Sequence, residues 1–169
     1  MPFWTRSRPA DDRPQNAVSR LQAAVRKHLP QADDDTVRIV ASFAGLLAAV
    51  GYADQSFCQE EQRHVRKVLG RIHGLDHLAV EALLDVLRAE APEASAIHMH
   101  QLARDLRELT DRDTRLEMLD AFVDLAAADN DLSYAETRYL RQLTTSLGLD
   151  ASDYNASQHR HRDKLSILR

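Results

Sequence analysis

Cysteine, glycine, proline and aromatic residues are all scarce in this sequence of 169 residues. The single cysteine, Cys58, excludes an internal disulfide and a thiolate metal site, because both need more than one thiolate. A lone thiol also fits a reducing compartment, so we expect a cytoplasmic protein. Glycine and proline number five each and aromatic residues make up 5%, whereas apolar residues make up 44%. This balance favours helices packed through Leu, Ala and Val over a glycine-rich β architecture.

Long apolar runs and a surplus of positive charge are missing as well. No segment approaches the 18 uninterrupted apolar residues of a membrane span, and the first residues lack the apolar core of a signal peptide. We therefore expect no direct membrane insertion. The 26 acidic residues outnumber the 22 basic ones, which argues against binding to the phosphate backbone of nucleic acid. The expected partners are proteins, membrane-associated ones included.

The composition divides the chain into three parts. Residues 1–14 hold three of the five prolines and predict a flexible tail. Residues 15–150 predict one helical domain, and residues 151–169 a C-terminal helix or tail that leads toward a further domain. Apolar residues at helical spacing, with breaks at Pro30 and Pro92, predict helices over 15–28, 36–52, 59–73, 77–90, 94–109, 111–129 and 134–147, then a short eighth helix from Asp150.

Two acidic segments repeat at an offset of 75 positions, residues 47–61 and residues 122–136. Both copies later reach Gly-Leu-Asp, after one residue of slippage. The segments align without a gap and pair Ala53 with Ala128, Asp54 with Asp129, Phe57 with Leu132 and Glu61 with Glu136. The helices expected over 36–52 and 111–129 are apolar around most of their circumference, so we expect them to pack together at the centre. We predict an all-α bundle of seven to eight helices with an internal pseudo-two-fold duplication.

The repeated pattern is Ala-Asp-x-x-apolar-x-x-x-Glu at the end of a buried helix, followed by a helix that ends in Gly-Leu. It resembles the TerB-like family of tellurite-resistance proteins and the related N-terminal domain of membrane-anchored DnaJ-type co-chaperones. The resemblance covers roughly residues 36–150. It departs after each Asp, where the family usually has glycine and this chain has Gln55 and Asn130. The resemblance implies a helical module with an acidic, cation-binding face and a link to tellurite or stress resistance.

The acidic residues have two interpretations. The resemblance places cation binding on Asp54, Glu61, Asp129 and Glu136, and Asp131 adds a carboxylate in the second copy; calcium and magnesium prefer such oxygens. The other interpretation is structural: the segment from Ser133 to Glu136 is a capping box, and Cys58 to Glu61 has the same frame with a weaker cap. An EF-hand is excluded, because neither copy has its glycine and glutamate at the sixth and twelfth places. Capping alone, or capping with weak divalent-cation binding, both stay open here.

Catalytic motifs are missing from the sequence. It has no glycine-rich phosphate loop, nucleophile elbow or H-E-x-x-H pair, and the spacing of its eight histidines does not favour a shared ion, so we expect no enzyme. Four arginines at matching places are candidates either to pair with Asp54 or Asp129 or to form a solvated helix face: Arg63, Arg66, Arg138 and Arg141. Residues 163–169 are faintly similar to the opening of a J-domain, although no His-Pro-Asp tripeptide occurs. This similarity gives an alternative function, an accessory N-terminal domain of a DnaJ-like co-chaperone.

Overall fold

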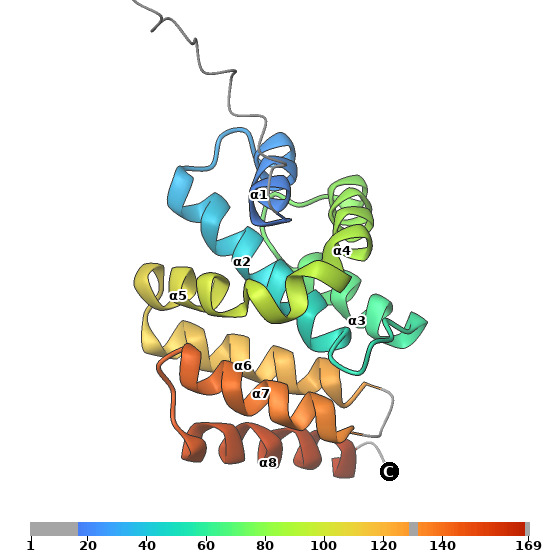
Figure 1. Ribbon diagram of the computed structural model, residues 1–169, viewed down its shortest axis with the longest axis vertical. Helices are drawn as coiled ribbons and strands as arrows, with labels where there is room; N and C mark the ends of the chain where they lie inside the picture. Colours follow the sequence, from blue (N-terminus) through green and yellow to red (C-terminus); the bar gives the residue numbers. More distant parts are fainter. Residues whose placement is uncertain (1–16, 129–131, 168–169) are drawn as a thin grey trace, which may run out of the picture.

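The computed structural model describes residues 17–128 and 132–167, with the backbone alone over 91–97 and 163–167. These residues form eight helices and no strands (Figure 1). The helices are α1 (Ala17–His28), α2 (Asp34–Gly51), α3 (Gln59–Leu69), α4 (His77–Ile97), α5 (Met99–Leu109), α6 (Arg112–Ala126), α7 (Tyr134–Ser146) and α8 (Ala151–Ile167). The predicted all-α bundle is confirmed. The tail expected over residues 1–14 lies outside the described residues.

Helix α2 is the centre of the bundle. It packs against α1, α4, α5 and α6, and its residues from Ala44 to Gly51 are all buried. The expected packing of this helix against 111–129 is confirmed by the contact of α2 with α6, where the rings of Phe43 and Phe122 lie 5.5 Å apart. Each fully buried Leu or Phe of this core contributes roughly 1.5–3 kcal/mol through removal from water. In Figure 1, α6, α7 and α8 lie side by side below α2, and α5 lies across it.

Aspartate caps fix the starts of several helices. Asp33, Asp76 and Asp111 each accept a hydrogen bond from the backbone amide three residues later, at 2.7–2.8 Å. Such a bond satisfies an amide that the first helical turn leaves without a partner. Because Asp33 is the cap, α2 begins two residues before the position expected from its apolar pattern.

Several expected helix boundaries were wrong, among them the end of the helix expected over 111–129, since α6 ends at Ala126. Helix α4 runs through Pro92 to Ile97, so the break before α5 falls at His98 and not at the proline. Proline removes one helical hydrogen bond without forbidding the helical φ angle. Helix α3 ends at Leu69, and turns lead from there to Gly74, which has a φ of 90°. Helix α8 is 17 residues long, which is not the short helix expected.

None of the helices in the described ranges combines the length and apolar character that crossing a bilayer requires.

Candidate functional site

The turn between α2 and α3 is closed by its own side chains. Asp54 is exposed, and its Oδ1 accepts hydrogen bonds from the Ser56 amide at 2.9 Å and the Ser56 hydroxyl at 2.8 Å. Gln55 between them has a φ of 69°, in the left-handed region that glycine adopts most readily. The position at which the resembled family usually has glycine therefore keeps a glycine-like backbone with a different residue.

Both glutamates of the acidic pattern complete capping boxes. In the first turn, the Cys58 amide donates to Glu61 Oε2 at 2.6 Å, and the Glu61 amide lies 3.5 Å from Cys58 Sγ. In the second, the Ser133 amide donates to Glu136 Oε2 at 2.8 Å, and the Glu136 amide donates to Ser133 Oγ at 3.1 Å. Both predicted capping boxes are confirmed, and the sulfur cap is the longer and weaker of the two.

The two glutamates are buried although they carry carboxyl groups. Glu61 is 4% exposed and Glu136 is 3% exposed. Burial raises the pKa of Glu61 from 4.5 to about 7, the hydrogen bonds from Cys58 oppose this rise, and repulsion from Asp54 and Glu136 adds to it. The charges of Asp54 and Glu136 therefore both act on the Glu61 carboxyl. In Figure 1 the α2–α3 turn and the start of α7 lie at the same side of the molecule.

The other two predicted site residues, Asp129 and Asp131, lie outside the described residues. Among the residues that are described, no group of three His, Cys, Asp or Glu side chains is arranged to hold a metal ion. An ion bound at the acidic turns would therefore need oxygen ligands beyond Asp54, Glu61 and Glu136.

The arginines after the first turn have other partners than Asp54. Arg63 forms an ion pair with Glu60 on its own helix, and Arg66 forms one with Glu81 of α4. Their pairing with Asp54 is therefore not observed, and Arg66 instead joins α3 to α4. A charge pair between two helices was not visible from spacing within either helix.

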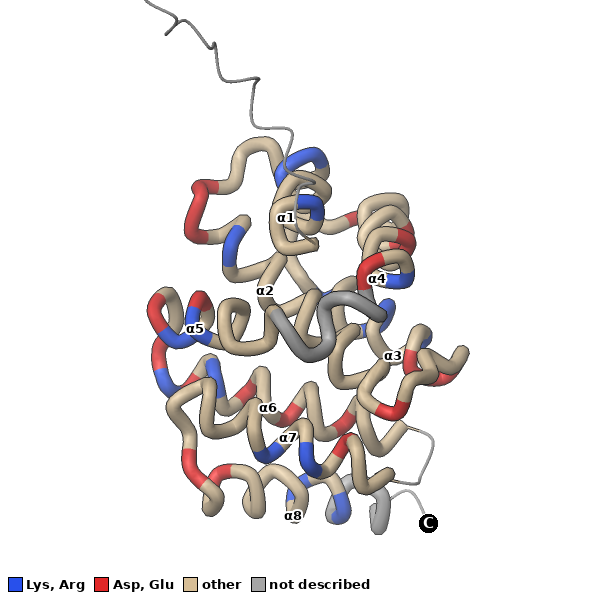
Figure 2. Tube along the Cα trace, viewed as in Figure 1, with Lys and Arg blue, Asp and Glu red and all other residues tan. Residues whose placement is uncertain are grey.

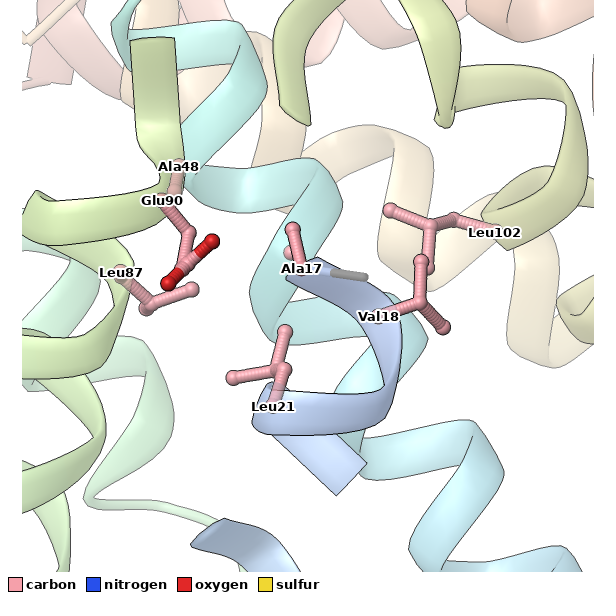
Figure 3. A pocket seen from close by; sticks show the side chains of 8 residues that line it. Ala17, Val18, Leu21, Ala48, Leu87, Glu90 and Leu102 are labelled. Atoms are coloured by element: carbon pink, nitrogen blue, oxygen red, sulfur yellow. The ribbon is translucent and has the colours of Figure 1, made fainter. Parts of the chain in front are cut away.

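One apolar cavity between the helices has no room for a ligand. It lies where α1 meets α2, α4 and α5, is lined mainly by Val18, Leu21, Leu87 and Leu102, and has a volume of about 10 Å³ (Figure 3). A volume of this size holds about one water molecule. The carboxylate seen beside it belongs to Glu90, which accepts two hydrogen bonds from the Arg20 guanidinium at 2.6 Å each.

A larger groove, of about 540 Å³, lies between α3 and α6 and was missed by the sequence analysis. Its walls carry opposite charges: His64, Lys67 and Arg71 on one side and Glu117, Asp120 and Asp124 on the other. The signal was present, because both sets follow the same spacing of three and then four residues, the spacing of one helix face, although Arg71 lies in the turn just after α3. What spacing did not reveal is that α3 and α6 are neighbours.

Two histidines, His64 and His161, interact with Asp124 at the groove, which spacing along the chain did not predict. His161 of α8 lies with Nδ1 2.8 Å from Asp124 Oδ1. Burial lowers the pKa of the nearby His64, and the charge of Asp124 opposes that change. Helix α8 therefore contacts the α6 wall of the groove at Asp124.

Comparison with known protein families matches residues 40–159 to the model of the tellurite resistance protein TerB. The match covers well over half of the chain and includes both acidic turns. No curated protein and no solved structure matches the chain.

Proposed function

The chain belongs to the TerB family of tellurite resistance proteins, and from this premise we propose that it is a non-enzymatic interaction module whose acidic turns bind a divalent cation weakly. The observation that supports the proposal is the carboxyl of Glu61, whose pKa is raised to about 7 first by burial and further by the charges of Asp54 and Glu136. The protein partners, a cytoplasmic location and a role in tellurite or stress resistance are parts of the same proposal.

A divalent cation would relieve this repulsion. Calcium and magnesium bind carboxylate and carbonyl oxygens, and sites with few protein ligands have dissociation constants on the order of 0.1–1 mM. Asp129 and Asp131 would supply the further oxygens. Because Glu61 has to lose its proton before it can bind a cation, binding should strengthen as the pH rises through about 7.

The surroundings of Glu61 argue against a catalytic role. A catalytic acid needs contact with substrate, whereas Glu61 is 4% exposed and its Oε2 already accepts the Cys58 amide at 2.6 Å. A raised carboxyl pKa alone does not make an active site, since burial in a structural position has the same effect. The acidic turns are therefore proposed as a surface that other molecules bind.

Titration with calcium or magnesium, followed by backbone amide NMR shifts, tests the cation proposal. We expect saturable shifts at residues 54–61 and 129–136, and a weaker response in the double variant Asp54→Asn, Asp129→Asn with its helicity unchanged. Asp150→Asn is a matched control, because Asp150 also accepts the amide and hydroxyl of a serine two residues later, in a turn outside the proposed site. Absence of saturable shifts at both turns, or equal weakening by the control, would refute cation binding.

The alternative function, an accessory N-terminal domain of a DnaJ-like co-chaperone, follows from the faint J-domain similarity of residues 163–169. Helix α8 extends to Ile167, so the backbone is helical into that segment. A J-domain encoded directly downstream in the native locus would support this alternative. A neighbouring membrane transporter gene would favour the first proposal.

A further inference from the structure

The groove between α3 and α6 has an apolar part and a charged part. The apolar part, of about 340 Å³, lies beside Ile39, Phe43, Ile72 and Met118. It shares Val68, Arg71 and Glu117 with the charged part of about 540 Å³, so the two parts form one continuous groove. An apolar strip with charged margins is the surface that an amphipathic helix recognises.

The charges along the groove are only partly neutralised within the chain. Asp120 is held by Arg160 and by the Ser157 hydroxyl, both from α8, and Asp124 contacts His161. Lys67, Arg71 and Glu117, in contrast, make no side-chain hydrogen bond or ion pair within the described residues. Figure 2 shows acidic residues spaced along α6. The groove therefore offers two positive charges on the α3 side and one negative charge on the α6 side.

Another groove of the same protein already holds a helix. Helix α5 packs on α2 and α7. The Ser42 hydroxyl of α2 lies 3.4 Å from Asp105 Oδ2 of α5, and the Ser146 hydroxyl of α7 lies 3.1 Å from His100 Nδ1 of α5. Gly45 of α2 allows close approach, because a Cβ there would lie 3.0 Å from Leu102 of α5.

The residues beneath α5 correspond to residues of the open groove. At the offset of 75 positions, Ser42 corresponds to Glu117 and Gly45 to Asp120. Ser146 corresponds to Arg71 at this offset and to Ile72 after the one-residue slippage before Gly-Leu-Asp, and all of these counterparts line the open groove. The helix in sequence order that would cover it is α1, but α1 packs on α2 and α4. The α3–α6 groove thus corresponds to the groove that α5 occupies. No helix from the described residues lies in it.

We propose that the α3–α6 groove binds an amphipathic helix of a partner protein, seated as α5 is seated on α2 and α7. Where α5 has His100, the partner helix carries an acidic residue that meets Arg71 and Lys67. Where α5 has Asp105, it carries a basic residue that meets Glu117. The proposal rests on the proposed function only in treating the chain as an interaction module, and it is independent of cation binding.

The test uses peptides copied from α5. The probe is a fluorescein-labelled peptide of residues 98–110, stapled to hold it helical, with His100→Glu and Asp105→Lys. The control peptide has the opposite charges, His100→Lys with Asp105 kept. Fluorescence anisotropy with the full chain should give saturable binding of the probe, at least tenfold tighter than that of the control peptide.

Protein variants then test the charge matching. Lys67 and Arg71 are exposed, so the double variant Lys67→Glu, Arg71→Glu should fold normally. It should bind the probe at least tenfold more weakly than the parent and should prefer the control peptide. The matched control, Lys27→Glu with Arg141→Glu, reverses two exposed charges elsewhere and should bind as the parent does.

Amide NMR shifts locate the bound peptide and separate the other possible occupants. Shifts confined to residues 64–72 and 114–124 support the proposal. It is overturned by lack of saturation up to millimolar peptide, by equal affinity for both peptides, or by shifts centred on α2 and α7. If binding of the peptide shifts the fluorescence of Trp4, the groove is assigned to the chain's own tail. If the protein dimerises and Lys67→Glu, Arg71→Glu abolishes the dimer, the groove is assigned to a second copy. Either result overturns the proposal. Loss of peptide binding with an intact calcium response would leave the proposed function standing.

Discussion

The two acidic turns make the same hydrogen bonds with different atoms. In the first, a thiol lies 3.5 Å from the Glu61 amide, while the Glu61 carboxylate lies 2.6 Å from the Cys58 amide. In the second, a hydroxyl lies 3.1 Å from the Glu136 amide and the carboxylate 2.8 Å from the Ser133 amide. Sulfur is a weak acceptor, so the first helix start depends more on its glutamate. The comparison teaches that the buried carboxylate, and not the cap atom, is the feature that both turns keep.

The apolar contacts at the two turns differ in a compensating way. In the first copy, Gly51 faces Phe57, and a Cβ on Gly51 would lie 2.9 Å from the phenyl ring. At the offset of 75 positions the second copy has Ala126 and Leu132, of which Ala126 is buried and Leu132 packs against the core. The first pair, Gly51 and Phe57, combines no side chain with a large ring, and the second pair, Ala126 and Leu132, combines a methyl group with a smaller side chain. The two pairs therefore fill similar volumes. This comparison suggests that volume is conserved where identity is not.

The largest expected effect concerns pH. The pKa of Glu61 is about 7 in the folded protein and near 4.5 in the unfolded chain, so the folded state binds this proton more tightly. The resulting stabilisation is complete below about pH 4.5 and is lost as the pH rises through about 7. Relative to Glu61→Gln, which carries no titrating group, the parent should lose roughly 3 kcal/mol of unfolding free energy between pH 4 and pH 8.5, at about 1.4 kcal/mol per pH unit. Urea unfolding across this range measures the difference.

The second turn provides the control for this titration. Because the Glu136 carboxylate raises the pKa of Glu61, Glu136→Gln should move the midpoint of the Glu61 titration to lower pH. A chemical-shift titration of the Glu61 side chain follows it directly. A midpoint that does not move would mean that the two turns are too far apart to interact.

The next effect tests the compensating volumes. Gly51→Ala should destabilise the protein by about 1–3 kcal/mol, because the new methyl group meets the Phe57 ring. Adding Phe57→Leu, which reproduces the pair found in the second copy, should restore a large part of that loss. A double-mutant cycle in urea measures the coupling. Ala126→Gly should cost about 1 kcal/mol through helix propensity, and Phe57→Leu should not offset it.

The sequence predicted the parts of the fold that depend on local chemistry. Apolar spacing located all eight helices, and the serine–glutamate and cysteine–glutamate frames predicted both capping boxes, because a cap and its partner lie three residues apart. The start of α2 was missed by two residues, since Asp33 and not the first apolar residue begins it. The break expected at Pro92 was wrong. Proline destabilises a helix locally, but the packing of α4 against α1, α2 and α3 outweighs this penalty.

The sequence predicted less of the sites, because sites depend on which helices become neighbours. The pattern identified Glu61 and Glu136 but not their burial, which follows from the packing of both turns against the core. The groove between α3 and α6 was missed although its charged residues have regular spacing. Spacing within one helix specifies a face, whereas the partner of that face is a property of the whole bundle.

A smaller effect compares the cap atoms. Cys58→Ser should stabilise the protein by about 0.5–1 kcal/mol, because a hydroxyl is the better N-cap acceptor, and Ser133→Cys should destabilise it by a similar amount. Denaturation midpoints of the two single variants and the double variant measure both signs. Unchanged stability in both single variants would mean that the glutamates alone determine where the two helices begin.

The smallest effect concerns backbone strain in the first turn. A residue with a side chain costs about 1–2 kcal/mol in the left-handed region, which Gln55 occupies at a φ of 69°. Gln55→Gly removes this cost but adds about 0.5–1 kcal/mol of entropy to the unfolded chain, so a net stabilisation of roughly 0.5 kcal/mol is expected. Gln101→Gly, at an exposed position inside α5, should instead destabilise by about 1 kcal/mol.

Asparagine tolerates the left-handed region better than glutamine. If the second turn has the same backbone, Asn130→Gly should therefore stabilise less than Gln55→Gly, and an equal or larger gain would show that the two turns differ.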